Sequence, residues 1–195
     1  GDTGLNTGGM GAISPVPFVD DQLFERIENE VVKPTVNGVK AENYNYKGII
    51  FIGLMVVKGK PYVIEYNVRM GDPETEVVFP RIESDVVDLF EAIAQGALSS
   101  VEISINPQTA ATVIAVSGGY PESYEKNKKI KGLEQVTESV VFHAGTTLKE
   151  GEVLTSGGRV LALTSFGKDK DEALAKSYNS LNQVKFDKMN YRKDI

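Results

Sequence analysis

Two runs rich in β-branched and aromatic residues follow each other across a short turn, and this pair constrains the fold more than any other feature. The first run covers residues 48–57 and the second covers residues 62–69, with Lys58-Gly59-Lys60-Pro61 between them. Glycine and proline in a short polar link are typical of a turn between antiparallel strands. The sequence therefore predicts a β-hairpin in the first half of the chain.

Helical patterns flank this hairpin. The first helix is expected to begin at Asp20 or Asp21 and to end at Pro34, with an apolar face made of Leu23, Phe24, Ile27 and Val31. The second is expected to be capped by Ser84 and to stop at Gly96, with a buried stripe made of Val86, Leu89, Phe90, Ile93 and Ala94. Residues 1–97 thus combine helices with an antiparallel pair of strands.

Short strands dominate beyond a polar stretch that follows Gly96. The expected strands are residues 110–116, 139–144, 152–155 and 159–164, with glycine-containing turns between them. Asp169, with Glu172 three residues later, then opens a helix. The sequence predicts a mixed α/β (α+β) chain with two domains, residues 1–97 and a small β-rich domain with a packed helix over residues 98–195.

Composition narrows the class of protein. The 195 residues contain no Cys, which excludes a disulfide scaffold, a Cys-ligated zinc site and a thiol nucleophile. The longest apolar run, residues 49–57, is too short to cross a bilayer, and no basic-then-apolar leader opens the sequence, so we expect neither a membrane span nor a secretory signal. The absence of Cys fits a reducing compartment, so we expect a cytoplasmic protein. A net charge of -6 argues against nonspecific nucleic-acid binding.

The acidity is concentrated in the first half. Residues 1–100 hold 15 acids and 8 bases, whereas residues 101–195 hold 12 acids and 13 bases. This imbalance suits a site that collects cations.

The second strand of the predicted hairpin carries chemistry on one face. Because side chains alternate along a strand, Glu65, Asn67 and Arg69 should share a face, opposite a face made of Tyr62, Ile64 and Tyr66. Glu65 and Asn67 would offer oxygen ligands with Cα atoms about 7 Å apart, which suits Mg²⁺. Arg69 could hold a phosphate or a carboxylate. A solvated polar strand face is the alternative interpretation.

An acidic turn follows at once. Asp72, Glu74 and Glu76 place three carboxylates beside the strand end, and Pro73 favours a turn or a helix start. Asp72 could accept hydrogen bonds from backbone amides while the two glutamates face outward. The alternative is an acidic helix N-terminus without a ligand.

The opening segment, residues 6–12, is rich in glycine. Its backbone N–H groups could approach an anion or a small ligand closely, although it is neither a Walker A loop nor a dinucleotide fingerprint. A flexible terminus is the alternative. The chain has no initiator Met and opens on loop-forming residues, so we expect a fragment of a longer protein.

Taken together, the motifs are far more specific than any one of them. In order they are Asp2-x-Gly4-x-Asn6-Thr7-Gly8-Gly9-Met10-Gly11-Ala12, Glu65-Tyr66-Asn67-Val68-Arg69-Met70-Gly71-Asp72-Pro73-Glu74-Thr75-Glu76, Ser117-Gly118-Gly119-Tyr120-Pro121, Phe142-His143-Ala144-Gly145-Thr146, Thr155-Ser156-Gly157-Gly158-Arg159-Val160-Leu161 and Tyr191-Arg192-Lys193-Asp194-Ile195. This series resembles the glycinamide ribonucleotide synthetase family of ATP-grasp ligases. The resemblance covers the C-terminal half of such an enzyme, namely the later part of the ATP-grasp core and the small C-terminal domain, with the N-terminal domain and the lid lying upstream of Gly1.

The resemblance implies a function in purine biosynthesis. ATP would phosphorylate glycine to glycyl phosphate, and 5-phosphoribosylamine would displace phosphate to give glycinamide ribonucleotide. It implies that ATP and Mg²⁺ (or Mn²⁺) are used, that Glu65 and Asn67 are metal ligands and that Arg69 is the catalytic stabiliser of the transferred phosphoryl group. The substrate-binding residues it implies are Asp2, Asn6, Thr7, Gly8, Gly9, Met10, Gly11, Asp72, Pro73 and Glu74.

One departure and two alternatives accompany this resemblance. Many ATP-grasp proteins carry a further acidic ligand on the preceding strand, but residues 51–54 here contain no acid, so the number of metal ions stays open.

A noncatalytic ATP-grasp-like binding module, or a related carboxylate–amine ligase with another substrate, would fit the same motifs. The expected partners are the small-molecule substrates and the N-terminal half of the same chain, without which we expect this piece to be inactive.

Overall fold

The computed structural model describes residues 4–195, which form two compact units. The first unit combines three segments, namely the segment that ends at Ser14, Asp72–Arg81 and Asn106–Ile195. The second combines Pro15–Gly71 and Ile82–Ile105. The units are therefore interleaved along the sequence. The boundary between residues 97 and 98 stays a prediction.

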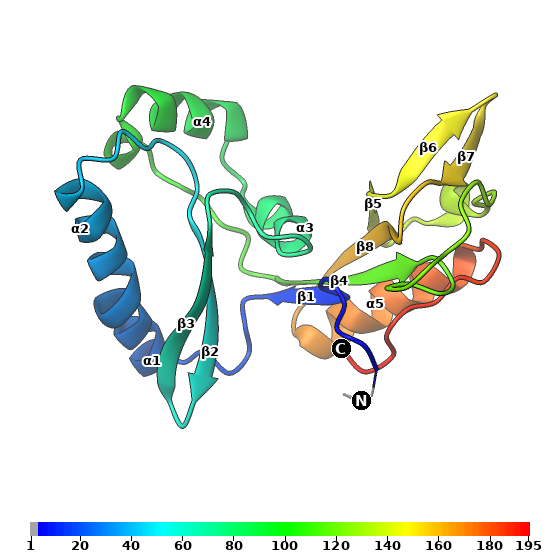
Figure 1. The fold of residues 1–195 in the computed structure, drawn as a ribbon, viewed down its shortest axis with the longest axis horizontal. Helices are drawn as coiled ribbons and strands as arrows, with labels where there is room; N and C mark the ends of the chain where they lie inside the picture. Colours follow the sequence, from blue (N-terminus) through cyan, green and yellow to red (C-terminus); the bar gives the residue numbers. More distant parts are fainter. Residues whose placement is uncertain (1–3) are drawn as a thin grey trace. The chain divides into compact units, whose positions relative to one another are not determined.

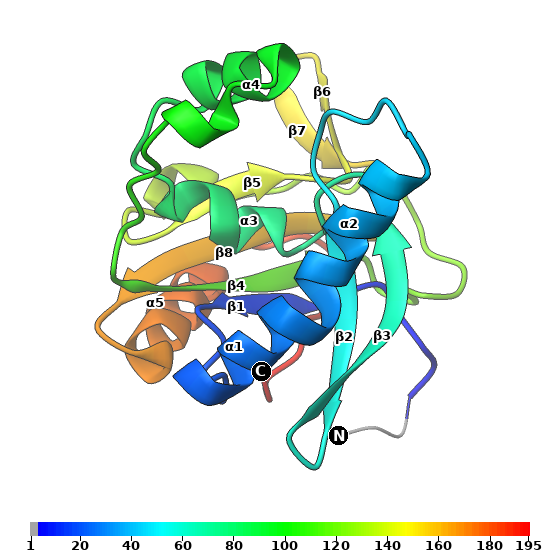
Figure 2. The same cartoon turned by 90° about the vertical axis from the view of Figure 1, so that its left-hand side faces the viewer.

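A helical rod and a hairpin make up most of the second unit. Helix α1 (Asp21–Ile27), the π-helix η1 (Glu28–Val32) and α2 (Lys33–Ala41) follow one another without a break. They lie along the hairpin of β2 (Phe51–Val57) and β3 (Lys60–Asn67) (Figure 2). An apolar cavity of about 320 Å³ separates residues of the rod from residues of β2.

The rod does not end at Pro34, contrary to the prediction. In η1 the turns are wider, and the Lys33 N–H donates to Glu28 O, five residues earlier. Pro34 therefore falls in the first turn of α2, where a residue without an N–H is tolerated. The apolar face was also drawn too wide, since Leu23 is buried but Phe24 is 64% exposed.

The next helix, α4 (Val86–Gln95), begins one residue later than expected. Asp85 caps it by accepting a hydrogen bond from the Val87 N–H at 2.8 Å, whereas the Ser84 hydroxyl accepts from the Ser104 N–H at 2.8 Å. The stop at Gly96 is confirmed, with a left-handed φ of 72°. Leu89 and Ala92 are buried in this helix, while Phe90 and Ala94 are exposed. The short 3₁₀ helix η3 (Leu98–Ser100) follows.

The predicted hairpin is confirmed, but a β-bulge changes its faces. Glu65 lies opposite Gly53, and Asn67 lies opposite Phe51. The register then shifts between Gly53 and Leu54, so that Tyr62 lies opposite Met55 whereas Tyr66 lies opposite Ile52. Because Ile52 and Met55 are three residues apart on β2, Tyr62 and Tyr66 do not share a face.

A four-stranded antiparallel sheet organises the first unit. Its order is β1 (Gly11–Ser14), β4 (Thr109–Val116), β8 (Arg159–Gly167) and β5 (Val140–His143), as Figure 1 shows. A separate ribbon pairs β6 (Thr146–Lys149) with β7 (Glu152–Thr155). Strands β4, β5, β7 and β8 match the predicted ones closely. Strands β1 and β6 were not predicted, because each has only four residues and lies where glycine indicated loop or turn.

Both faces of this sheet are covered. Helix α5 (Lys170–Gln183) packs on one face over Ala111, Val113, Leu161 and Leu163. The opposite face carries Ile114, Val116 and Ala162, against which Met10, Tyr120 and Phe142 pack. Helix α3 (Thr75–Val78), which continues into η2 (Phe79–Arg81), contacts β1, β4 and β8. The remaining short helix is η4 (Leu133–Gln135).

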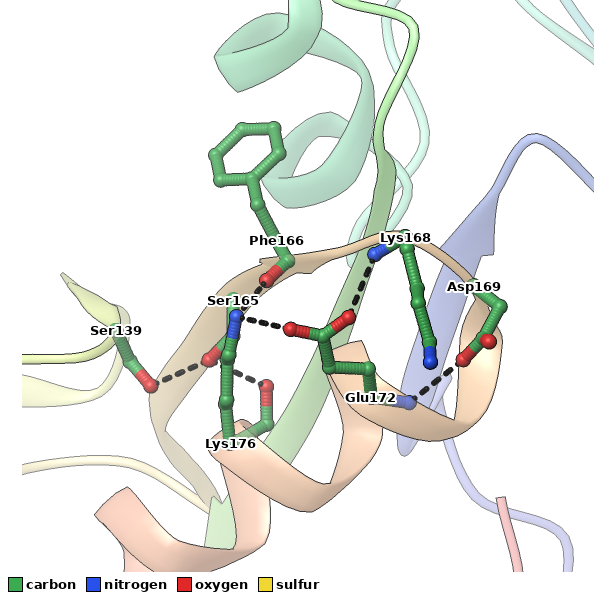
Figure 3. A network of polar contacts seen from close by, with 8 residues as sticks. Ser139, Ser165, Phe166, Lys168, Asp169, Glu172 and Lys176 are labelled. Carbon is green, nitrogen blue, oxygen red and sulfur yellow. Dashed lines mark hydrogen bonds and ion pairs between the residues drawn. The ribbon is translucent and has the colours of Figure 1, made fainter.

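A polar network fixes the start of α5, as predicted (Figure 3). Asp169 Oδ1 accepts from the Glu172 N–H at 2.9 Å, and Glu172 Oε2 accepts from the Lys168 N–H at 3.0 Å. Lys176 Nζ donates to Phe166 O at 3.0 Å and pairs with Glu172 at 2.8 Å. Within residues 4–195, no helix has the length and apolar character needed to cross a bilayer.

Candidate functional site

The glycine-rich segment is held against the sheet of the first unit. Gly11 enters β1 opposite Val113, and Met10 O accepts a hydrogen bond from the Ile114 N–H at 3.0 Å. One step earlier, the Gly8 N–H donates to the Tyr120 hydroxyl at 3.0 Å. Residues 6–11 are therefore tied to the C-terminal part of the chain, which argues against a free terminus.

The same segment packs against the acidic turn. Gly9 lies on Pro73, which follows a cis peptide bond after Asp72. A Cβ added at Gly9 would collide with Pro73 Cδ, and one added at Gly8 would lie 3.1 Å from the Tyr120 hydroxyl. Glycine is required at residue 9 because the rigid ring of Pro73 leaves no room for a side chain.

Arg159 connects these two segments. Its Nη1 donates to Gly9 O at 3.2 Å and to Asp72 O at 2.9 Å, and it pairs with Asp72 Oδ1 at 3.0 Å. Asp72 was expected to accept from backbone amides, but its described partner is this guanidinium. Arg159 was missing from the predicted site residues, although it lies in the motif Thr155–Leu161 that carried part of the resemblance.

A cavity of about 750 Å³ opens beside this contact. Backbone and polar groups of the glycine-rich loop form one wall, and the turn around Tyr120-Pro121 forms another. The lining residues are Gly4, Leu5, Asn6, Thr7, Gly8, Gly9, Met10, Val116, Gly119, Tyr120, Pro121, Glu122, Asn190 and Arg192. Such a cavity has the size and polarity to take a small polar ligand.

Among the described residues of this unit, Glu76 in α3 is the acid whose pKa is raised. Burial raises the pKa of its carboxyl, and the nearby charges of Asp72 and Glu74 act in the same direction, while Arg159 opposes them. Among the described residues, Glu76 Oε2 is buried without a hydrogen-bond partner. The prediction that Glu76 faces outward is therefore wrong.

The predicted metal ligands lie in the second unit. Asn67 Nδ2 donates to Glu65 Oε1 at 3.1 Å, so the two side chains share a face, as the alternation predicts. Arg69 does not continue their row, because β3 ends at Asn67. Instead Arg69 Nη1 donates to Met70 O at 2.8 Å, and the residue lines a separate cavity of about 560 Å³.

The donor chemistry of this pair fits Mg²⁺. A carboxylate and an amide supply the hard oxygen ligands that Mg²⁺ prefers, and the ion ordinarily completes its shell with water and substrate phosphate. Within residues 4–195, no group of three His, Cys, Asp or Glu side chains forms a ready-made metal cage.

The structure thus places the predicted site residues in two sets. Glu65, Asn67 and Arg69 belong to the second unit, while residues 6–11 and 72–74 belong to the first and contact each other there. Asp2 lies outside the described residues. The roles assigned to all of these residues stay predictions.

Comparison with known families decides the identity of the chain. The family "Phosphoribosylglycinamide synthetase, ATP-grasp (A) domain" matches residues 1–75, and "Phosphoribosylglycinamide synthetase, C domain" matches residues 110–195. The chain belongs to the phosphoribosylglycinamide synthetase family. This result confirms the resemblance and the ATP-grasp fold expected from the motifs.

Individual relatives agree with this assignment. The phosphoribosylamine–glycine ligase of Neisseria meningitidis serogroup B is 48% identical, over 100% of this chain and 47% of that protein. A crystal structure of the same ligase from Thermotoga maritima is 39% identical with a TM-score of 0.86, over 100% of this chain and 48% of that one. The chain spans about half the length of the curated relatives that it matches.

A more distant structure shares the fold alone. The crystal structure of N5-carboxyaminoimidazole ribonucleotide synthetase from Thermotoga maritima is 17% identical with a TM-score of 0.61, over 90% of this chain and 45% of that one.

Proposed function

We propose that this chain is part of a phosphoribosylamine–glycine ligase and acts together with an N-terminal half of the same protein. The full-length enzyme would join glycine to 5-phosphoribosylamine in purine biosynthesis, consuming ATP. One observation carries the catalytic part of the proposal: Glu65 and Asn67 share one face of β3 and hydrogen-bond to each other at 3.1 Å. The names of the relatives support the choice of substrates.

The proposed reaction has two steps. A glycine carboxylate oxygen attacks the γ-phosphorus of ATP, which breaks the bond to the β-phosphate oxygen and gives glycyl phosphate and ADP. The amine nitrogen of 5-phosphoribosylamine then attacks the acyl carbon. The bond between that carbon and the phosphate oxygen breaks, inorganic phosphate leaves, and the nitrogen loses a proton. No covalent bond to the protein is needed, so the protein contributes positioning and charge.

Glu65 and Asn67 would hold Mg²⁺ (or Mn²⁺) through their side-chain oxygens. When bound, the ion would offset negative charge on the ATP phosphate oxygens. Arg69, whose Nη1 donates to Met70 O, would stabilise charge on the phosphoryl group through its guanidinium.

The first unit would hold glycine, which receives the phosphoryl group, and 5-phosphoribosylamine, which receives the glycyl group. The cavity bounded by residues 4–10 combines backbone groups of the glycine-rich loop with polar side chains that include Glu122 and Arg192, which suits small polar substrates such as glycine and a sugar amine. Asp72, Pro73 and Glu74 adjoin the loop and complete the proposed substrate-binding set, together with Asp2.

The metal-ligand pair is tested by Glu65→Gln and Asn67→Ala in the full-length enzyme. We expect ADP formation to fall by roughly 100-fold or more, because charge stabilisation at the phosphoryl group would be lost. The thermal midpoint should change little, since Glu65 is exposed and Asn67 is half-buried on the strand surface.

Glu25→Gln is the matched control, because it removes an exposed carboxylate from the same unit without touching the hairpin. Its turnover should equal that of the wild type. Near-normal ADP formation by both hairpin variants would refute the proposed role, and stimulation by another acid or amine in place of glycine or phosphoribosylamine would redirect it to a related ligase.

A further inference from the structure

Two segments that are distant in the sequence meet at the guanidinium of Arg159. Its Nη1 lies 3.2 Å from Gly9 O, 2.9 Å from Asp72 O and 3.0 Å from Asp72 Oδ1. Gly9 is 150 residues away along the chain, and Asp72 is 87 residues away. One cation thus connects the glycine-rich loop, the acidic turn and the first residue of β8.

The geometry around this cation leaves little freedom for the loop. On one side Gly9 packs on Pro73, and on the other the Gly8 N–H donates to the Tyr120 hydroxyl at 3.0 Å. A Cβ at Gly8 would come within 3.2 Å of Arg159 Cζ, so the guanidinium lies directly against the loop backbone. The Arg159 side chain is 24% exposed, and a planar group held in this way is not replaced by the compact ammonium of lysine.

These contacts of Arg159 with Gly9 and Asp72 are called the clamp below. A glycine-rich loop gains more from such contacts than other loops do. Glycine loses more conformational freedom than any other residue when it is ordered. The contacts of Arg159 fall on the two carbonyl groups and the carboxylate that bring loop and turn together. Residues 8 and 9 also line the 750 Å³ cavity, so the clamp and the cavity share a wall.

We propose that Arg159 is a positioning residue: it holds the glycine-rich loop against the Asp72–Pro73 turn, and so fixes the loop backbone that faces the adjoining cavity. This inference rests on the proposed function only in treating that cavity as the site of glycine or the phosphoribosyl amine. Arg159 does not react. Its effect is transmitted through the position of residues 8 and 9.

The kinetic test uses Arg159→Ala and Arg159→Lys in the full-length enzyme. We expect Arg159→Ala to raise the KM for glycine or for phosphoribosylamine by roughly tenfold or more while the KM for ATP changes little, because small displacements of a binding loop weaken productive binding. Arg159→Lys should recover only part of the loss. Millimolar guanidinium added to the Ala variant should restore part of it, since a free guanidinium can occupy the vacated contacts.

Arg81→Ala is the matched control. Arg81 belongs to the same unit and also bonds across the chain, with Nη1 donating to Ser14 Oγ at 2.8 Å and Nε donating to Asn106 O at 3.1 Å, but it does not contact the loop. Arg81→Ala should lower the thermal midpoint without changing the KM for glycine or phosphoribosylamine relative to the KM for ATP. Equal effects of the two alanine variants on both KM values would show that Arg159 is only structural and would overturn the proposal.

Hydrogen exchange gives a readout that needs no activity. In the full-length protein, Arg159→Ala should speed amide exchange across residues 4–11 about tenfold, whereas Arg81→Ala should leave this segment unchanged. If the wild type proves inactive with glycine and phosphoribosylamine, the proposed function fails while faster exchange still supports the clamp. Unchanged exchange in both Arg159 variants would overturn the clamp whatever the activity.

Discussion

At the residue scale, the pKa of the Glu76 carboxyl reflects how tightly its surroundings are packed. Burial raises the pKa of its carboxyl above the ordinary value of 4.5, with Asp72 and Glu74 adding to the effect. A carboxyl whose pKa is raised by folding stabilises the fold when it is protonated, and this contribution is lost as pH rises through the folded-state pKa. The ionised form is therefore a cost at neutral pH.

Glu76→Gln should consequently raise the thermal midpoint at pH 8. The difference from the wild type should shrink as the pH falls from the raised folded-state pKa to below 4.5, because Glu76 is then protonated in both the folded and the unfolded chain. Thermal melts across this pH range measure the effect. Glu74→Gln removes a charge from the same turn as a control, and a pH-independent difference for Glu76→Gln would argue against burial as the cause.

Sequence reasoning at the residue scale succeeded where a pattern was local. Glu65 and Asn67 share a face because they are two positions apart on one strand, and the sequence shows that spacing directly. Arg159 was missed because its two contacts lie 87 and 150 residues away. The only available signal was its place after Gly157-Gly158 in a motif of the resemblance.

At the scale of elements, α5 is specified by its own first residues. Asp169 accepts from the Glu172 N–H, and Glu172 accepts from the Lys168 N–H, so two backbone donors at the start of the helix are satisfied. Asp169→Ala should cost about 1 kcal/mol, and should lower the thermal midpoint by about 2–4 °C. Calorimetry of the chain measures this.

Asp171→Ala is the control for that experiment. Its side chain is 89% exposed and its carboxylate lies 3.6 Å from Lys170 Nζ, so it removes a first-turn acid without removing the cap. We expect less than half the effect of Asp169→Ala. A larger loss for Asp171→Ala would mean that the charge in the first turn, and not the cap, stabilises α5.

Elements whose bounds depend on distant packing were predicted less well. Pro34 usually stops a helix, but the wide turn of η1 lets the rod continue to Ala41. The bulge near Ile64 cannot be read from alternation, because only the opposing strand shows that an extra residue is accommodated. Strand β1 has four residues, and its pairing with β4 defines it.

At the scale of the whole molecule, the chain matches about half the length of its relatives over its entire extent. We therefore expect the 195-residue chain by itself to release no ADP in the presence of glycine, phosphoribosylamine and ATP. In the proposed full-length enzyme, the lid and the adenine-binding parts would belong to the N-terminal half. A coupled ADP assay with the full-length enzyme as positive control measures this, and glycine-dependent turnover by the chain alone would contradict it.

Because the two units are interleaved along the sequence, their contacts can form only in a certain order during translation. Strand β1 leaves the ribosome before the hairpin, but its partner β4 begins at Thr109 and Arg159 follows later still. At a translation rate of 5–20 residues per second, on the order of ten seconds pass between synthesis of the glycine-rich loop and synthesis of Arg159. Until β4 has emerged, the second unit's hairpin can already pair while β1 remains an unpaired strand. In nascent chains arrested before Arg159, strand β3 with Glu65 and Asn67 should therefore already pair with β2. The glycine-rich loop should still lack its contact with Arg159.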